Sequence, residues 1–203
     1  MPFRDHFRPP LDDITSWDGF YGGWPAVIVQ QFHKVFPPGY VAGPRIHLGL
    51  KADSDFPVYE VRVYDATQGD RRLVATIEIV SPGNKDRPKS RTAFVARCAA
   101  LLQQGVAVSL IDPVTIYDFN LYADLMALLG HVDSTLGDPP PSLYAGTCRP
   151  ITKDNRNMFE AWSHRLVVGQ PLPTLPLWLS PTRVVPLDLE PGYEQTCHDL
   201  WLA

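Results

Sequence analysis

The chain has 203 residues, of which 45% are hydrophobic and 20% are charged, a balance typical of a globular domain with a substantial core. Its 21 prolines predict many extended connections and few long helices. The formal net charge of −4 excludes a global basic field that would recruit nucleic acid, although a local basic groove is compatible with it.

Secretion, membrane insertion and zinc binding are not expected. The first ten residues, MPFRDHFRPP, lack the apolar region of a signal peptide, and no segment is long and apolar enough to span a membrane. The three cysteines are odd in number and far apart, which favours free thiols in a reducing cytoplasm. The six histidines show no zinc-ligand spacing. We therefore expect a cytoplasmic protein with no membrane partner.

The N-terminal part is predicted to contain one helix and one strand. Residues 1–23 are rich in Pro, Gly and Asp, which predicts an irregular segment. Residues 24–36 predict a helix, because Pro25 suits a first turn and the Pro-Pro-Gly at 37–39 ends it. Residues 41–50 predict a strand.

The middle of the chain predicts a hairpin followed by a crossover. Residues 59–64 and 73–80 read as antiparallel strands, and residues 81–89 as a loop with turn chemistry. A helix over 91–104 and a buried strand over 106–111 follow. This order implies a crossover that lays the last strand parallel to an earlier one.

The C-terminal part is predicted to add a second β element. Residues 120–129 predict a helix, and residues 143–148 and 159–166 a second hairpin. The proline-rich tail over 170–189 is predicted to be extended against the body, because prolines are excluded from central strands. Residues 193–200 predict a short final helix.

Glu78 is the most informative residue of the chain. It lies inside an apolar strand, where a carboxylate is costly to bury unless it is paired, hydrogen-bonded or bound to a metal. Its expected partner is an arginine, either Arg62, Arg91 or Arg97, or else a second acid. At helical spacing Arg91 projects near the middle of the apolar helix face, and Arg97 lies at the edge of that face.

Glu60 offers a test of these alternatives. If the hairpin turn is centred near 68–69, Glu60 faces Glu78 across the ladder and Arg62 lies diagonally. Paired carboxylates would favour a metal or a shared proton, whereas Arg62 with Glu78 would make a buried ion pair. The register decides between them, and a slip of one residue reverses the two faces.

The chain resembles the bacterial family called domain of unknown function 4058. The resemblance rests on YEVRVYD, LVATIEIVSPGNKDRP, FVARCAALLQQGVAVSLID, FNLY, PLPTLPLWL and VPLDLEPGYEQTCHDL, and it runs over most of the chain. Within that family, the IEIVSP strand, the basic helix and the LIDP strand resemble the core of PD-(D/E)XK restriction-endonuclease-like proteins.

This resemblance implies a single α/β domain over residues 1–203. Its mixed central sheet would combine the antiparallel hairpin with the parallel crossover strand, flanked by helices. Residues 1–50 would supply the N-terminal helix and strand, residues 58–130 the nuclease-like core, and residues 140–203 the C-terminal β element and the tail.

The resemblance also implies a metal-dependent mechanism. Active members hold Mg²⁺ with two acids, and a lysine beside the metal orients the attacking water. Any metal held by this chain is therefore expected to be Mg²⁺ or Mn²⁺. Glu78 matches the strand glutamate, but Val80 stands where the usual lysine would be. The basic residue of the helix matches Arg91 or Arg97, and arginine does not deprotonate in proteins. Lys85 and the neighbouring Lys89 are alternatives on the loop.

The first acid of the pattern has no clear counterpart. Asp53 and Asp55 fall in what reads as a loop. The second oxygen ligand, if a metal is held, is therefore expected from Glu60, Asp65 or Asp112. The missing lysine and the incomplete acid set favour a degenerate, non-catalytic binding or scaffold module whose partner is unknown, nucleic acid being one candidate. The alternative is a Mg²⁺-dependent nuclease acting on phosphodiesters through Glu78.

Overall fold

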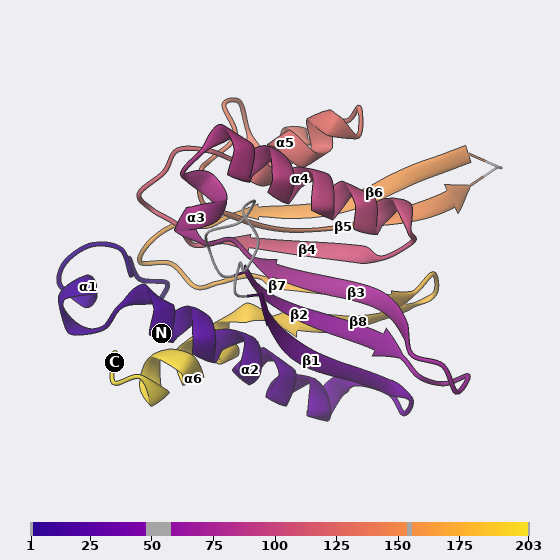
Figure 1. Cartoon of the computed structure of the whole chain (residues 1–203), viewed down its shortest axis with the longest axis horizontal. Coiled ribbons are helices and arrows are strands. Elements are labelled where there is room, and N and C mark those ends of the chain that lie inside the picture. The colour runs from indigo at the N-terminus through magenta and orange to yellow at the C-terminus, as the bar shows by residue number, and fades with distance from the viewer. Residues whose placement is uncertain (1, 48–57, 154–155, 203) are drawn as a thin grey trace.

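A six-stranded mixed sheet forms the centre of the protein (Figure 1). The computed structural model describes residues 2–47, 58–153 and 156–202. The strands follow chain order across the sheet: β1 (Tyr40–His47), β2 (Val58–Asp65), β3 (Arg72–Ile79), β4 (Ala107–Asp112), β5 (Tyr144–Lys153) and β6 (Arg156–Arg165). β3 and β4 pair in parallel, whereas the other neighbouring strands pair antiparallel. The predicted α/β class with a mixed central sheet is confirmed.

The predicted crossover is also confirmed. β3 and β4 lie side by side in parallel, with Glu78 opposite Leu110, and helix α4 (Pro88–Gln103) connects them. The helix begins at Pro88, three residues before the predicted start at residue 91. Proline is favoured at a first helical position, where its missing N–H has no helical partner to lose.

Part of the predicted loop before α4 is helical. Residues Pro82–Lys85 form a short helix, α3, which starts directly after β3. The Asn84 side-chain oxygen accepts hydrogen bonds from the Ser81 backbone N–H at 2.8 Å and from the Ser81 hydroxyl at 3.0 Å. These bonds satisfy the polar groups of a turn that is buried in the fold.

The N-terminal segment is more helical than predicted. Residues 1–23 were expected to be irregular, but they contain α1 (Leu11–Ile14) and the start of α2 (Trp17–Val35). The Ser16 hydroxyl caps α2 by accepting from the Asp18 backbone N–H at 3.3 Å. Pro25 therefore lies inside the helix. The burial of aromatic residues along α2 explains this difference, because packing outweighs local propensity.

The C-terminal elements complete the fold. Helix α5 (Leu121–Leu128) and the 3₁₀ turn η1 (Ser134–Leu136) precede the hairpin β5–β6, which joins the central sheet through β4. The tail predicted as extended forms a separate two-stranded sheet, β7 (Thr174–Ser180) and β8 (Arg183–Asp188), followed by α6 (Leu189–Asp199).

Two layers of secondary structure cover the two faces of the sheet (Figure 1). α4 and α5 pack on one face, while α2, α6 and the β7–β8 hairpin pack on the other. On the second face the Tyr21 hydroxyl of α2 donates a 2.6 Å hydrogen bond to the carbonyl oxygen of Val80, at the end of β3. α4 and α2 therefore pack on opposite faces of the sheet, and side chains of β3 that point toward α4 are separated from α2 by the sheet.

Candidate functional site

Two carboxylates face each other beneath α4. Glu60 on β2 lies directly opposite Glu78 on β3, and both residues are 0% exposed. The sequence left the register of the hairpin open, and the structure contains the register in which Glu60 faces Glu78. Residues alternate between the two faces of a strand, so both side chains point to the α4 face of the sheet.

Arginines from three elements, α4, β2 and β1, lie beside this pair. The Arg97 Nη2 of α4 lies 2.8 Å from the Glu78 Oε2, and the Arg97 Nη1 lies 4.0 Å from the Glu60 Oε2. The Arg62 Nε donates to the Glu60 Oε1 at 2.8 Å, and the Arg45 Nε is 3.8 Å from the same oxygen. Of the three predicted arginine partners of Glu78, Arg97 is the one that contacts it.

Burial dominates the electrostatics of Glu78. Desolvation raises the pKa of the Glu78 carboxyl to about 7, against the lowering effect of Arg97 and with the help of the facing Glu60. The Thr76 hydroxyl adds a longer hydrogen bond, 3.3 Å, to the Glu78 Oε1. Near neutral pH the two carboxylates thus carry fewer than two full negative charges.

Lys85 and Asp112 form a second, separate buried pair. The Lys85 Nζ lies 2.9 Å from the Asp112 Oδ2, and both side chains are fully buried. Lys85 also donates to the Ser142 carbonyl oxygen at 3.2 Å, and the Val114 backbone N–H donates to the Asp112 Oδ1. Burial raises the pKa of Asp112 to about 6, and Lys85 opposes that rise.

Arg91 and Asp65 lie apart from the Glu60–Glu78 pair. The Arg91 Nη1 donates to the Lys85 carbonyl oxygen at 2.9 Å, and its guanidinium lies 3.7 Å from the ring centroid of Phe119. Asp65 pairs with Arg72 at the turn end of the hairpin, where hydrogen bonds from Thr67 lower the pKa of its carboxyl.

The predicted acids are therefore not gathered into one site. Glu60 and Glu78 come together, whereas Asp65 and Asp112 lie elsewhere. Asp53 and Asp55 fall outside the described residues. Within 2–47, 58–153 and 156–202, no group of three or more His, Cys, Asp or Glu side chains is arranged to hold a metal ion.

Sequence reasoning did not find the role of Arg45. Its contact with Glu60 depends on the pairing of β1 with β2, in which Arg45 lies opposite Glu60. No local pattern specifies that register, because β1 and β2 are joined through a long connection. The three cysteines are free, as predicted, and the structure buries all of them.

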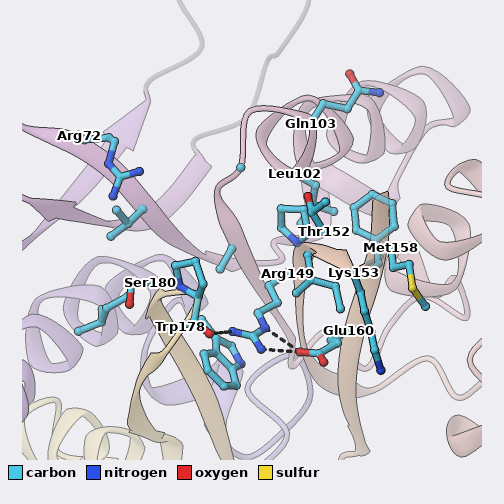
Figure 2. Close-up of a pocket in the computed structure, with 18 residues that line it drawn as sticks. Arg72, Leu102, Gln103, Arg149, Thr152, Lys153, Met158, Glu160, Trp178 and Ser180 are labelled. Atoms are coloured by element: carbon cyan, nitrogen blue, oxygen red, sulfur yellow. Dashed lines mark hydrogen bonds and ion pairs between the residues drawn. The ribbon is translucent and has the colours of Figure 1, made fainter. Parts of the chain in front are cut away.

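Sequence reasoning also did not find a cleft of about 810 Å³ at the other end of the sheet (Figure 2). Its walls come from β3, β5, β6, β7 and the end of α4. At its centre Arg149 pairs with Glu160 at 2.6 Å and lies 3.2 Å from the ring centroid of Trp178. The signal in the sequence is faint, because these residues are far apart along the chain.

Comparison with protein-family models, with curated proteins and with solved structures finds no match to this chain. The resemblance to domain of unknown function 4058 and to the PD-(D/E)XK group thus remains a prediction. Among the described residues, every helix is too short or too polar to cross a membrane.

Proposed function

We propose that this protein is a non-catalytic binding module built on a core like that of PD-(D/E)XK proteins. The observation that carries the proposal is the 2.8 Å contact between Arg97 and Glu78. It places the permanently charged guanidinium of Arg97 against the Glu78 carboxylate, which would otherwise be the central metal ligand.

Three of the four oxygens of the carboxylate pair accept a hydrogen bond. Arg97 and Thr76 occupy the two oxygens of Glu78, and Arg62 occupies one oxygen of Glu60. Mg²⁺ requires near-octahedral coordination by oxygen atoms and keeps several waters. A guanidinium at this position repels a divalent cation and fills the space that those waters need.

The chain also offers no lysine to activate water beside Glu78 among the described residues. Val80 stands at the usual lysine position, and its carbonyl accepts the Tyr21 hydroxyl. Lys85 is held by Asp112 in a separate buried pair. Arg97 cannot act as a base, because its guanidinium stays protonated.

A Mg²⁺-dependent nuclease would also contain facing carboxylates. The test of the proposal therefore measures metal binding and cleavage of nucleic acid directly. We expect calorimetric titration with millimolar Mn²⁺ to give no binding heat, and incubation with single- and double-stranded DNA and RNA to give no cleavage. Glu78→Gln should behave like the parent in both assays. Cleavage that is lost in a folded Glu78→Gln variant would establish the nuclease instead.

A second variant makes this test more demanding. Arg97→Met removes the guanidinium and leaves both carboxylates in place. If the arginine is what excludes the metal, Arg97→Met should bind Mn²⁺ more tightly than the parent, and the added substitution Glu78→Gln should abolish that gain. Equal, undetectable binding in all variants would mean that the geometry of the pair, and not Arg97, excludes the metal.

A further inference from the structure

The cleft arises because β4 is shorter than its neighbours. β4 begins at Ala107, which lies opposite Ala75 of β3. On its other side, the next residue, Val108, pairs with Cys148 of β5. β3 extends beyond this point by residues 72–74 and β5 by residues 149–153. The two neighbours thus border a gap in the sheet, which the end of α4 and the end of β7 also line.

The lining of the cleft is basic, although the whole chain is acidic. Among the described residues, Arg72, Arg149 and Lys153 line it together with one acid, Glu160, so the described lining carries three positive charges and one negative charge, a net +2. Arg149 and Glu160 neutralise each other at 2.6 Å. The net charge of the chain is −4. This contrast favours an anionic ligand.

Two of these cations remain accessible at the sides of the cleft. The Arg72 side chain is 72% exposed, and its Nη2 lies 3.4 Å from the Asp65 Oδ2 in a long ion pair. Lys153 is exposed at the end of β5. Figure 2 shows the two side chains on different sides of Arg149. An exposed ion pair contributes little free energy, so Arg72 can exchange Asp65 for a ligand carboxylate.

The aromatic rings of the cleft contact neighbouring side chains, which limits their stacking on bases. Arg149 covers one face of Trp178, and the Trp162 ring packs 5.6 Å from the Trp178 centroid. Phe159 meets the His131 ring in an edge contact. Single-stranded nucleic acid is bound largely by open aromatic platforms. The covered rings therefore favour a peptide over a nucleic acid.

The apolar part of the lining suits a hydrophobic side chain between acidic ones. Val74, Ile151 and Met158 contribute to it, and Met158 is 44% exposed. A methionine at a binding surface adapts to side chains of different shape. The lining thus offers separate partners for carboxylates and for an apolar group.

The β5 wall is poorly suited to the addition of a further strand. The Leu166 backbone N–H donates to the Leu143 carbonyl, so odd-numbered residues of β5 direct their backbone groups to β6. Even-numbered residues face the gap, and one of them is Pro150, which has no N–H to donate. Side chains, and not a backbone ladder, would hold the ligand.

From these features we propose that the cleft binds an acidic peptide segment of a partner protein, with its carboxylates on Arg72 and Lys153 and an apolar side chain on the lining between them. This inference deepens the proposed binding function and rests on it. None of Glu60, Glu78 and Arg97 lines the cleft, so it is a second location on the protein.

The test uses fluorescence anisotropy of the full chain with a labelled peptide of repeating Glu-Glu-Leu units. Arg72→Glu and Lys153→Glu should each weaken its binding about fivefold, and their combination about 20-fold or more. Arg8→Glu is the matched control for Arg72, because Arg8 is 64% exposed and makes a similarly long ion pair, 3.7 Å, with Asp5. Lys34→Glu, on the exposed side of α2, is the control for Lys153.

Gln103→Trp provides a variant that leaves the charges unchanged. Gln103 is exposed at the end of α4 and lines the cleft, so a bulky side chain there should obstruct the peptide and weaken binding by at least about tenfold. A peptide with Lys in place of each Glu should not bind the parent.

Three results would overturn the proposal. They are no binding of the acidic peptide, equal weakening by the control variants, and preferential binding of a thymidine oligonucleotide through Arg72 and Lys153. These results differ from the result that would contradict the proposed function. That result is cleavage of nucleic acid by the parent that is lost in Glu78→Gln. A protein that cleaves phosphodiesters would refute the non-catalytic proposal and leave the peptide titration to be judged by itself.

Discussion

Glu60 lies directly opposite Glu78 in the antiparallel pair of β2 and β3, and neither side chain reaches solvent. Two carboxylates placed this way repel each other and lose their hydration. Arg97, which reaches both of them from α4, offsets that cost. The relation between the sheet and α4 thus depends on charge as well as on apolar packing.

Removal of Arg97 should destabilise the protein. Arg97→Leu leaves Glu78 buried opposite Glu60 without its closest cation, and we expect a loss of about 3 kcal/mol in the free energy of unfolding at pH 8. Urea denaturation followed by circular dichroism measures it. Arg8→Leu, which removes an exposed arginine with a 3.7 Å ion pair, should cost less than about 0.5 kcal/mol. Similar losses in the two variants would contradict the role assigned to Arg97.

The stability contributed by Glu78 should fall as pH rises. The folded pKa of Glu78 is about 7, above its ordinary value of 4.5, so the folded state binds the proton more tightly than the unfolded state. The contribution is present in full below pH 4.5 and is lost as pH rises through 7. A shift of this size corresponds to a loss on the order of 3 kcal/mol.

Glu78→Gln isolates this effect, because Gln resembles the protonated carboxyl. We expect the variant and the parent to be similarly stable at about pH 4, and the variant to be the more stable of the two above about pH 8. Urea midpoints across this pH range provide the measurement. Parallel pH profiles for the two proteins would show that Glu78 is ionised throughout.

The Lys85–Asp112 pair should matter more at high pH than at low pH. Lys85→Met leaves Asp112 buried without its cation, which should cost about 3–5 kcal/mol at pH 8. Because the pKa of Asp112 is already about 6 beside Lys85, protonation should reduce that cost at pH 5.

A double variant separates the lost ion pair from the lost packing at this position. Lys85→Met combined with Asp112→Leu should recover part of the stability at pH 8, because no charge is left buried. Thermal denaturation of the single and the double variant tests this, with Lys34→Met as the control for an exposed lysine. A double variant less stable than Lys85→Met alone would show that Asp112 stabilises the fold through its other hydrogen bonds.

Gly146 should tolerate no larger side chain. A Cβ at this position of β5 would lie 3.0 Å from the Tyr122 Cε2 of α5, a ring that is fully buried. Gly146→Ala should therefore destabilise the protein by about 1–3 kcal/mol. Gly43→Ala on β1 is the matched control, because nothing lies within 4 Å of its added Cβ. Calorimetric melting temperatures that change equally would refute the close packing of α5 on β5.

Local patterns in the sequence determined the middle of the fold. The apolar runs over 59–64, 73–80 and 106–111, together with their turn residues, predicted the hairpin and the parallel crossover that the structure contains. The same patterns predicted the burial of Glu78. These features follow from the period of two residues along a strand and from the length of the connection, both of which can be read locally.

Only the tertiary structure decided which groups meet across elements. The rotation of α4 on the sheet brings Arg97, and not Arg91, to Glu78. The order of the strands brings Arg45 to Glu60, and the late start of β4 relative to its neighbours opens the cleft beside Arg149. The buried pairing of Lys85 with Asp112 joins residues 27 positions apart. Such contacts depend on the packing of surfaces that are distant along the chain, and local propensity carries no information about that packing.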